Sequence, residues 1–456
     1  MTPSIDSDQT HSSVLIVGAG IFGTSTAYHL SLQASDHPGR TVTILDRAPF
    51  PPAPAASTDY NKIVRADYGV SYYMELGYEA MDAWATWPIF RALKQSEQNS
   101  SSPAFEGDDV YHRTGWIMFD EKGSDLASRI RRNFAKTGRG DPTSDIELEE
   151  AKKMWGGVLG KSDLSDFDSA YWNPEAGWVD AAEAVRRMMA EAVQRKVRYE
   201  VGEASELVLG NEDVKGVRTS DGRVFTADKI ILATGAWTPR LMLDVEKQLK
   251  LEDDERVKGQ MTAAGVCVAH YRSNDDTEFE QCKRLPVVIF GQSGEILPPT
   301  KDRIFKFTNA TSFTNTIHLS GGRTVSTPPD RPQDEVPEKL RAETEDIIRR
   351  EMPDMLAHGR KPDFWRLCWD AVTPSQNQLI TRHPNEKLRN LYFAVGGSFH
   401  SWKFLPIIGK YVVEVLEDKP IGEEKTRHWR WKTGDEGFGR GAHEKVVPKR
   451  ELKDLN

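Results

Sequence analysis

The apolar positions near the N-terminus form two short continuous runs separated by a mixed segment. The runs Val14–Val17 and Thr41–Leu45 are short and rich in β-branched residues, which is typical of buried parallel strands. The segment between them, from Thr24 to about Gln33, has the pattern of a helix. The chain is therefore predicted to begin with a strand–helix–strand unit.

A glycine motif joins the first predicted strand to the helix. Gly18, Gly20 and Gly23 have the spacing G-x-G-x-x-G, and Asp46 follows the second strand about 20 residues later. Gly18 permits a tight turn, Gly20 lets the backbone approach a pyrophosphate, and Gly23 lets helix and strand pack closely. The pyrophosphate would bind at the N–H groups of the helix N-terminus. Because Asp46 would accept hydrogen bonds from a ribose and repel an extra phosphate, the motif favours FAD or NAD over NADP.

A second part of the same sheet is predicted in mid-chain. An amphipathic helix runs from Ala181 to about Arg195, and the strand Val197–Val201 follows it. A strand pair, Glu206–Leu209 and Gly216–Thr219, precedes the apolar strand Lys229–Ala233, which ends in a glycine turn. Such a strand also occurs in other α/β proteins, so it supports a dinucleotide-binding domain only together with the glycine motif.

The length and the order of the elements predict a discontinuous domain. With 456 residues, the chain is too long for one simple core. We expect a mixed α+β and α/β protein. Its Rossmann-like dinucleotide-binding domain is assigned to residues 10–81, 175–245 and 365–422. Residues 82–174 and 246–364 are expected to form a second, sheet-rich substrate domain. Residues 423–456 are expected to form a charged tail that packs loosely along the surface, with its Trp residues as anchors.

Composition excludes several classes of protein. The net charge is −9 and the basic residues are dispersed, which argues against nucleic-acid binding. No apolar run approaches the length of a membrane span, and the polar, acidic N-terminus does not resemble a signal peptide. Three cysteines, Cys267, Cys282 and Cys368, are too few and odd in number for a disulfide framework. The last residues, Asp454–Asn456, are not a peroxisomal tripeptide. We expect a cytoplasmic protein with no metal site.

Three further stretches carry candidate chemistry. Lys62 and Arg65 lie just beyond the nucleotide unit, in a segment that ends with Tyr68-Gly69. A lone lysine, Lys306, interrupts an apolar strand. The third stretch pairs the segment Leu367–Pro374 with the glycine-rich segment Gly396–Pro406.

In this order, the motifs resemble those of the family of monomeric sarcosine oxidase. This family also includes the fungal fructosyl amino acid oxidases (amadoriases) and the saccharopine and pipecolate oxidases. The resemblance extends from Val14 to about Leu416, and the sequences KIVR at Lys62 and GSFHSWKFLP at Gly397 place the chain nearer the fungal branch. It implies a glutathione-reductase-like architecture of the D-amino acid oxidase type.

The resemblance also implies the cofactor. It implies FAD joined covalently, through its 8α-methyl group, to the thiolate of Cys368. By residue type alone, Cys368 would more often be a buried structural cysteine, and its spacing to Thr373-Pro374 is what favours attachment. The implied cofactor-binding residues are Gly18, Gly20, Ile21, Phe22, Gly23, Asp46, Arg47, Ser57, Lys62, Val201, Gly235, Trp237, Cys368, Gly397, Phe399, His400 and Lys403.

Lys306 matches the family lysine that sits over the flavin and promotes the reaction of the flavin with dioxygen. A fixed ammonium group would stabilise the superoxide anion as it develops. The alternative is a lysine at a strand edge that points to solvent. The alternation of Ile304, Lys306 and Thr308 with Phe305 and Phe307 fits a strand with one polar face.

Arg65 and Lys403 match residues that bind the substrate carboxylate in sarcosine oxidase. A guanidinium can pair bidentately with a carboxylate, and a lysine adds a point charge. The alternatives are a surface ion pair of Arg65 with Asp67 and a lysine at position 403 that extends from a helix towards solvent. Tyr68 and Phe399 are also candidates for the wall of the substrate pocket, and for Tyr68 a structural role fits equally well.

The glycine-rich segment departs from the family pattern. Many relatives read G-x-S-G-H-G-F-K, whereas Phe399 and Ser401 stand here in place of two glycines. Phe399 would narrow the space beside the flavin, so the substrate preference of relatives cannot simply be transferred. His400 is equally compatible with a pocket role and a structural role.

The resemblance implies a FAD-dependent oxidase of secondary amines, with Lys306, Arg65 and Lys403 as its catalytic residues. The substrates would be N-methyl, N-fructosyl, saccharopine-like or cyclic amino acids, and the products an imine and hydrogen peroxide. A role in fungal alkaloid or secondary-metabolite biosynthesis is compatible with it. No general base is predicted, because the protein would mainly orient a neutral amine. The expected partners are a small amine and dioxygen, with no nucleic acid or membrane, and the protein is expected to be a monomer. The alternatives are an amine dehydrogenase with another acceptor and a non-catalytic dinucleotide-binding protein.

Overall fold

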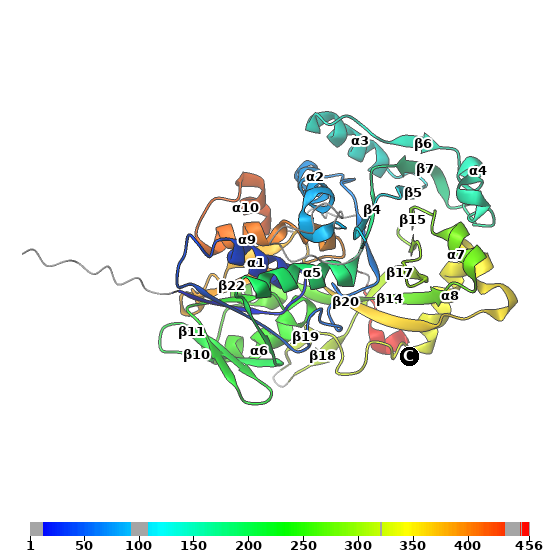
Figure 1. The fold of residues 1–456 in the computed structure, drawn as a ribbon. Coiled ribbons are helices and arrows are strands. Elements are labelled where there is room, and N and C mark those ends of the chain that lie inside the picture. The colour runs from blue at the N-terminus through cyan, green and yellow to red at the C-terminus, as the bar shows by residue number, and fades with distance from the viewer. Residues whose placement is uncertain (1–11, 93–107, 320–321, 434–446, 448, 456) are drawn as a thin grey trace, which may run out of the picture.

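The computed structural model describes residues 12–92, 108–319, 322–433, 447 and 449–455 (Figure 1). The N-terminal segment considered above as a signal peptide, and much of the tail 423–456, lie outside these residues. The described helices are α1 Ile21–Leu32, α2 Ser71–Thr86, α3 Leu126–Thr137, α4 Leu148–Ala151, α5 Ala181–Gln194, α6 Thr238–Leu249, α7 Asp276–Cys282, α8 Glu338–Glu351, α9 Ile408–Leu416 and α10 Glu423–Trp429. None of them is long and apolar enough to cross a lipid bilayer.

The first sheet has the strand order β21-β22-β13-β1-β2-β9. Its strands are β1 Ser13–Val17, β2 Thr41–Asp46, β9 Arg198–Val201, β13 Lys229–Leu232, β21 Leu379–Arg382 and β22 Leu391–Val395. The strands from β22 to β9 pair in parallel, and β21 is antiparallel at one edge. Helix α1 packs against both α5 and α9 (Figure 1). The predicted Rossmann-like sheet is therefore confirmed.

The boundaries of the first helix differ from the prediction. Helix α1 begins at Ile21 rather than Thr24, because Gly20 is extended and the chain enters the helix directly after it. A side chain on Gly23 would place its Cβ 1.8 Å from the Gly18 carbonyl oxygen. The third glycine of the motif is therefore required by packing inside the first turn of the helix.

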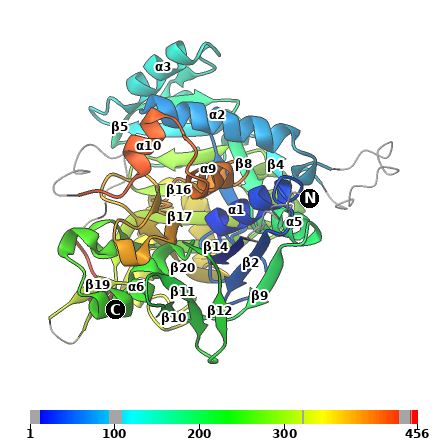
Figure 2. The ribbon, with the colours of Figure 1, turned by 90° about the vertical axis from the view of Figure 1, so that its left-hand side faces the viewer.

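The second large sheet has the strand order β20-β14-β17-β16-β15-β5-β7-β6. Its strands are β5 Trp116–Glu121, β6 Ser144–Ile146, β7 Phe167–Asn173, β14 Thr262–Arg272, β15 Val287–Phe290, β16 Gly294–Leu297, β17 Ile304–Thr314 and β20 Phe364–Val372. All neighbours are antiparallel except β5 and β15. Figure 2 shows α2 crossing the molecule above these strands.

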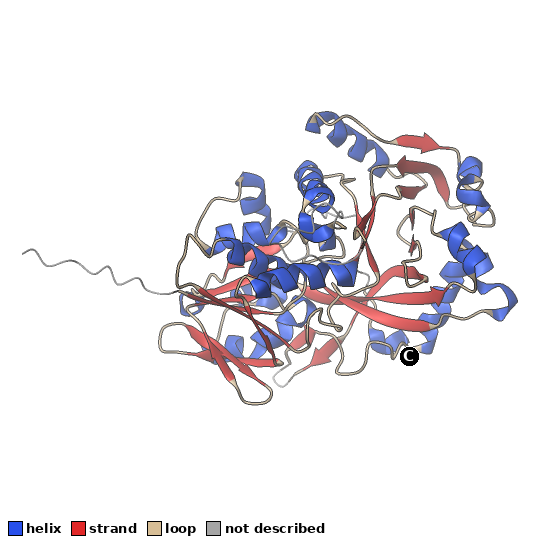
Figure 3. Ribbon diagram, in the orientation of Figure 1, coloured by secondary structure: helices blue, strands red, loops and turns tan. Residues whose placement is uncertain are grey.

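Three small sheets complete the described fold (Figure 3). They are β10 Ala204–Leu209 with β11 Val214–Thr219 and β12 Val224–Thr226, β3 Asn61–Val64 with β8 Gly177–Asp180 and β4 Tyr111–His112, and β18 Thr316–His318 with β19 Thr324–Ser326. The sequence pattern did not predict β8, which lies directly before α5. The proposed domain boundary at 365 falls at the start of β20, a strand that is hydrogen-bonded to β14 in the eight-stranded sheet.

The described part of the tail packs more closely than expected. Trp429 and Trp431 are buried, and the Trp431 indole N–H donates a hydrogen bond to the Asp254 carbonyl. Leu452 and Leu455 are also buried, in an apolar cluster that includes Phe313. The described part of the tail is therefore anchored by Trp429 and Trp431, in line with the expected Trp anchors, and also by Leu452 and Leu455.

Candidate active site

Several candidate site residues lie on one face of the eight-stranded sheet. Residues that pair across neighbouring strands point to the same face, so the strand register shows which side chains lie together. Cys368 on β20 pairs with Val266 on β14, and two residues further along β14 Val268 pairs with Thr308 on β17. Thr308 in turn pairs with Glu295 on β16. The register continues through Ile289 on β15 to Met118 on β5. All of these side chains line one cavity.

The cavity connects this sheet face to the glycine motif. It has a volume of about 600 Å³. Its wall includes most of the residues predicted to bind cofactor or substrate: Gly18, Gly20, Ile21, Phe22, Asp46, Arg47, Ser57, Lys62, Arg65, Tyr68, Gly235, Trp237, Lys306, Cys368, Gly397, Phe399, His400 and Lys403. Residues from both large sheets and the loops between them thus enclose one continuous space.

The nucleotide end of the cavity has the features that a pyrophosphate requires. Gly18 has φ +102°, and a Cβ there would lie 2.5 Å from the Ala233 carbonyl oxygen. The Ser57 hydroxyl is buried and has no hydrogen-bond partner among the described residues, and it lies 3.6 Å from the Cβ position of Gly20. The Asp46 carboxylate accepts hydrogen bonds from the Ala19 and Ala48 N–H groups. A tight glycine turn with a free hydroxyl beside it fits a dinucleotide phosphate.

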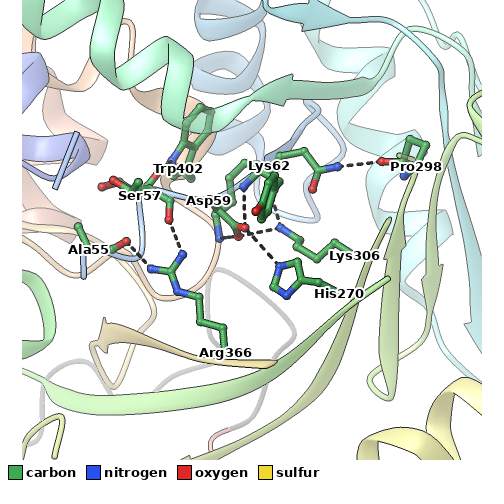
Figure 4. A network of polar contacts seen from close by, with 12 residues as sticks. Ala55, Ser57, Asp59, Lys62, His270, Pro298, Lys306, Arg366 and Trp402 are labelled. Carbon is green, nitrogen blue, oxygen red and sulfur yellow. Dashed lines mark hydrogen bonds and ion pairs between the residues drawn. The ribbon is translucent and has the colours of Figure 1, made fainter. Parts of the chain in front are cut away.

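A buried carboxylate joins the two predicted lysines. Asp59 Oδ2 lies 2.8 Å from Lys306 Nζ and 2.9 Å from Lys62 Nζ, as Figure 4 shows. Lys306 also donates a hydrogen bond to the Asn61 carbonyl, at 2.6 Å. His270 Nε2 lies 4.0 Å from Asp59 Oδ1. We refer to Asp59, Lys62, His270 and Lys306 as the Asp59 cluster.

Electrostatics within the Asp59 cluster favour the charged carboxylate. Burial opposes ionisation, but the Lys306 and Lys62 ammonium groups hold the pKa of Asp59 well below its usual range. Burial lowers the pKa of Lys306, and Asp59 only partly offsets this. For Lys62, Asp59 and the Cys368 sulfur outweigh burial and raise the pKa. Lys306 is 3 % exposed, so it does not point to solvent as the alternative interpretation required.

A strained loop lies next to Cys368. Ser398 and Phe399 both have positive φ, at 48° and 61°, which is uncommon for residues with a side chain. The Asp370 carboxylate accepts a hydrogen bond from the Phe399 N–H at 2.7 Å and contributes to holding this conformation. The partly buried Phe399 ring packs against the small apolar cluster that contains Cys368.

The other predicted basic residues form a second group. The Arg65 guanidinium lies 4.9 Å from the Tyr68 ring centroid and 4.8 Å from that of Trp116. Lys403 Nζ donates hydrogen bonds to the Tyr68 hydroxyl, at 2.9 Å, and to the His400 carbonyl, at 2.5 Å. We refer to Arg65, Tyr68, His400 and Lys403 as the Arg65 cluster.

Within the part of the chain that the structure describes, no carboxylate forms an ion pair with the cations of the Arg65 cluster. One guanidinium nitrogen of Arg65 is buried and has no hydrogen-bond partner among the described residues. Asp67 is instead bound by Tyr171 and Asn173, so the expected alternative of a surface ion pair does not hold. Burial lowers the pKa of Lys403 well below its usual range, and Arg65 lowers it further.

Two predicted cofactor residues lie outside the cavity wall, and several wall residues were not predicted. Gly23 packs inside the glycine turn, and the Val201 side chain is 44 % exposed, although the following residue, Gly202, lines the cavity. Asp59, Glu295 and Asp370 also line the cavity and were not predicted from the sequence. For Asp59 the only available signal was its place three residues before Lys62.

Comparison with known proteins agrees with this geometry. A family model described as DAO, FAD dependent oxidoreductase, matches residues 13–415. The chain belongs to this family. FAD dependence, which the glycine motif and the cavity indicated, is therefore a property of the family to which the protein belongs.

Relatives within the family cover nearly the whole chain. It is 27% identical to L-saccharopine oxidase of Schizosaccharomyces pombe, over 92% of this chain and 93% of that protein. It is 24% identical to amino acid oxidase fsqB of Aspergillus fumigatus, over 89% and 92% of the two chains. Among solved structures, Amadoriase I from Aspergillus fumigatus has 28% identity and a TM-score of 0.74, with 94% of this chain and 91% of that chain covered. The predicted resemblance to saccharopine oxidase and the amadoriases is confirmed.

Proposed function

We propose that this protein is a FAD-dependent oxidase of secondary amines that acts on N-substituted α-amino acids. The relatives named above support this class of substrate. In the overall reaction the amine loses two hydrogen atoms to become an imine, and dioxygen gains them to become hydrogen peroxide. Water then converts the imine to an amine and a carbonyl compound, unless the imine cyclises.

One observation carries the proposal: a single cavity joins the nucleotide loop, Cys368, Lys306 and the Arg65 cluster. When bound, FAD supplies the two-electron chemistry between amine and dioxygen. Arg65 and Lys403 would bind the substrate carboxylate, because their cations have no carboxylate partner within the described chain. The Lys306 ammonium group would stabilise negative charge that develops on dioxygen.

We further propose that the FAD is attached to the Cys368 sulfur. Cys368 is buried and lines the cavity, within electrostatic reach of Lys62 and Lys306. The thiolate is the nucleophilic form of cysteine. Cys267 is buried outside this cavity, in a separate apolar cluster.

The test is acid denaturation of the purified protein, followed by a flavin spectrum and the mass of the peptide that contains Cys368. We expect the flavin to remain on that peptide, to become extractable in Cys368→Ser, and to stay attached in the control Cys267→Ser. Hydrogen peroxide is then measured with N-methyl, N-fructosyl and saccharopine-like amino acids. Extractable flavin in the unaltered protein would refute the covalent link. Amine-driven bleaching without peroxide would point to a dehydrogenase, and no bleaching to a binding protein.

Two further features belong to this proposal. We expect the protein to be a monomer, which light scattering of the purified holoenzyme tests. We also expect it to act in the cytoplasm, which imaging of a tagged chain in its own host would check.

A further inference from the structure

Glu295 is a carboxylate on the cavity wall that the reaction above does not use. It lies on β16, is partly exposed to the cavity, and forms no hydrogen bond or ion pair within the described chain. We propose that Glu295 selects substrates whose nitrogen substituent ends in a second positive charge, such as an ammonium group. This inference rests on the proposed oxidase function and names the class of its substrate.

The register of the sheet places Glu295 beside the expected reaction centre. It pairs with Thr308 on one side and Ile289 on the other, so all three point to the cavity. Lys306 lies one strand away, on the same face, since it is two residues from Thr308. A group at Glu295 would therefore lie near the site expected for dioxygen and the amine.

The same register separates Glu295 from Arg65, which is proposed to bind the substrate carboxylate. Arg65 stacks on Trp116 of β5, and β15 lies between β5 and β16. Two strand spacings correspond to about 10 Å. A ligand that binds Arg65 through its carboxylate must therefore extend across the sheet to reach Glu295. An N-substituted amino acid has this extended form, with the reacting nitrogen between its two arms.

The charges around Glu295 explain why its partner must come from the ligand. Its neighbours Ile289 and Leu297 on the wall are apolar. Lys306 is already bound to Asp59, and Lys403 donates hydrogen bonds to Tyr68 and His400. The Glu295 charge acts on Lys403 from a distance and partly offsets the lowering of its pKa by burial, but the two side chains form no ion pair within the described chain. The nearby Glu351 cannot be this cationic partner, because a carboxyl group is either neutral or negative. Burial raises the pKa of Glu351 well above its usual range. A carboxylate in such surroundings is stabilised when a cation binds it.

The binding test uses inert ligands on the FAD-loaded protein. These are carboxymethyl thioethers, in which sulfur replaces the oxidisable nitrogen and the other arm, of graded length, ends in an ammonium, a methyl or a carboxylate group. Calorimetry of the unaltered protein should show the ammonium form binding about tenfold more tightly than the methyl form. Glu295→Gln should remove this preference, and Glu295→Lys should transfer it to the carboxylate form. The control Glu149→Gln, whose carboxylate is 77 % exposed on α4, should retain it.

The kinetic test uses N-alkyl glycines with the same three ends. If Glu295 binds the distal cation, Glu295→Gln lowers kcat/KM for the ammonium-ended substrate and leaves kcat/KM for the methyl-ended substrate unchanged. Equal losses for both substrates would overturn the proposal, because Glu295 would then contact the reacting amine. The proposal would also be overturned if the unaltered protein oxidised the three N-alkyl glycines equally well, a result that would leave the oxidase function intact. If no N-alkyl glycine is oxidised at all, it is the proposed function that fails.

Discussion

The cavity contains two basic groups that differ in how their charge is balanced. In the Asp59 cluster, one buried carboxylate binds both Lys62 and Lys306. In the Arg65 cluster, Arg65 stacks on aromatic rings and Lys403 donates to a hydroxyl and a carbonyl, without a carboxylate in contact. In the first group both ammonium groups contact a carboxylate of the described chain. The second has capacity for an anion.

This difference distinguishes cations that have a carboxylate partner within the protein from cations that are available to bind an anionic ligand. A buried ion costs several kcal/mol unless a partner is present, so a cluster with its own counter-ion can be maintained without ligand. A cluster that lacks one is stabilised when an anion arrives, which is the behaviour expected of a carboxylate-binding site. Variants in the two groups should therefore affect different properties.

The largest effect is expected from Asp59→Asn. This variant leaves two lysines buried without a counter-ion, and breaking such a pair costs about 3–5 kcal/mol of unfolding free energy. Denaturant unfolding of the holoprotein measures the loss. The double variant Asp59→Asn/Lys306→Met should recover much of it, because one unpaired cation is removed. Equal stability of the unaltered protein and Asp59→Asn would show that the ion pairs do not stabilise the fold.

The stability effect of Asp59→Asn should also depend on pH. The pKa of Asp59 is lowered on folding, so its contribution is complete above its unfolded value, about 3.9, and is lost as the pH falls towards the lower folded value. The stability difference between the unaltered protein and Asp59→Asn should therefore be constant near pH 6 and shrink below about pH 4.

Lys306→Met should separate stability from oxygen chemistry. Lys62 still neutralises Asp59 in this variant, so we expect a folded protein more stable than Asp59→Asn. Loss of the ammonium group should slow the reaction of the bound flavin with dioxygen about 10²–10³-fold, by analogy with other preorganised charges. Stopped-flow spectroscopy of the amine and oxygen half-reactions measures both steps, with the exposed Lys301→Met as the control. Unchanged oxygen kinetics would remove Lys306 from the proposed mechanism.

Arg65→Met tests the cluster without a counter-ion. Because Arg65 has no carboxylate bound to it, its loss should leave the thermal midpoint nearly unchanged. It should lower kcat/KM about 10²-fold for an N-methyl amino acid, and much less for the matching amine without a carboxylate. Steady-state peroxide assays on the two substrates give the ratio. A similar loss for both would show that Arg65 does not bind the substrate carboxylate.

The sequence could predict the parts of the site that local motifs encode. The glycine spacing and Asp46 follow the short-range geometry of a strand, a turn and a helix, and the structure has the predicted Rossmann-like sheet. The family resemblance indicated Lys306, Cys368 and Lys403, which all line the cavity. Their roles remain predictions that the experiments above address.

The partners of these residues could not be predicted, because they depend on the pairing of distant strands. Asp59 meets Lys306 across 247 positions of the chain. Glu295 lines the cavity only through the register of β16 against β15 and β17. The alternation around Lys306 also fitted the alternative of a polar face open to solvent, whereas in the structure Lys306 is buried. The hydrophobic pattern of a strand does not show which other elements will pack against its polar face.

The smallest effect concerns His400, which supports the Arg65 cluster. Burial, and secondarily the charge of Lys403, lower the pKa of His400 to about 3. Its Nε2 contacts the Gln376 carbonyl at 2.8 Å and its Nδ1 contacts the Tyr68 hydroxyl at 3.1 Å, which fits a neutral ring that donates from Nε2. The unfolded chain therefore binds a proton below about pH 6.5 that the folded protein does not.

This linkage makes His400 a source of acid sensitivity. Stability should fall as the pH drops from about 6.5, by about 1.4 kcal/mol per pH unit for this group, or about 2 kcal/mol at pH 5. In His400→Gln this part of the slope should disappear, so its unfolding free energy should change less between pH 7 and pH 5 than that of the unaltered protein. His37→Gln, whose side chain is 40 % exposed, is the matched control and should keep the full slope. Parallel pH profiles for all three proteins would mean that His400 is not buried in its neutral form, and that the Arg65 cluster is more open to water than its contacts indicate.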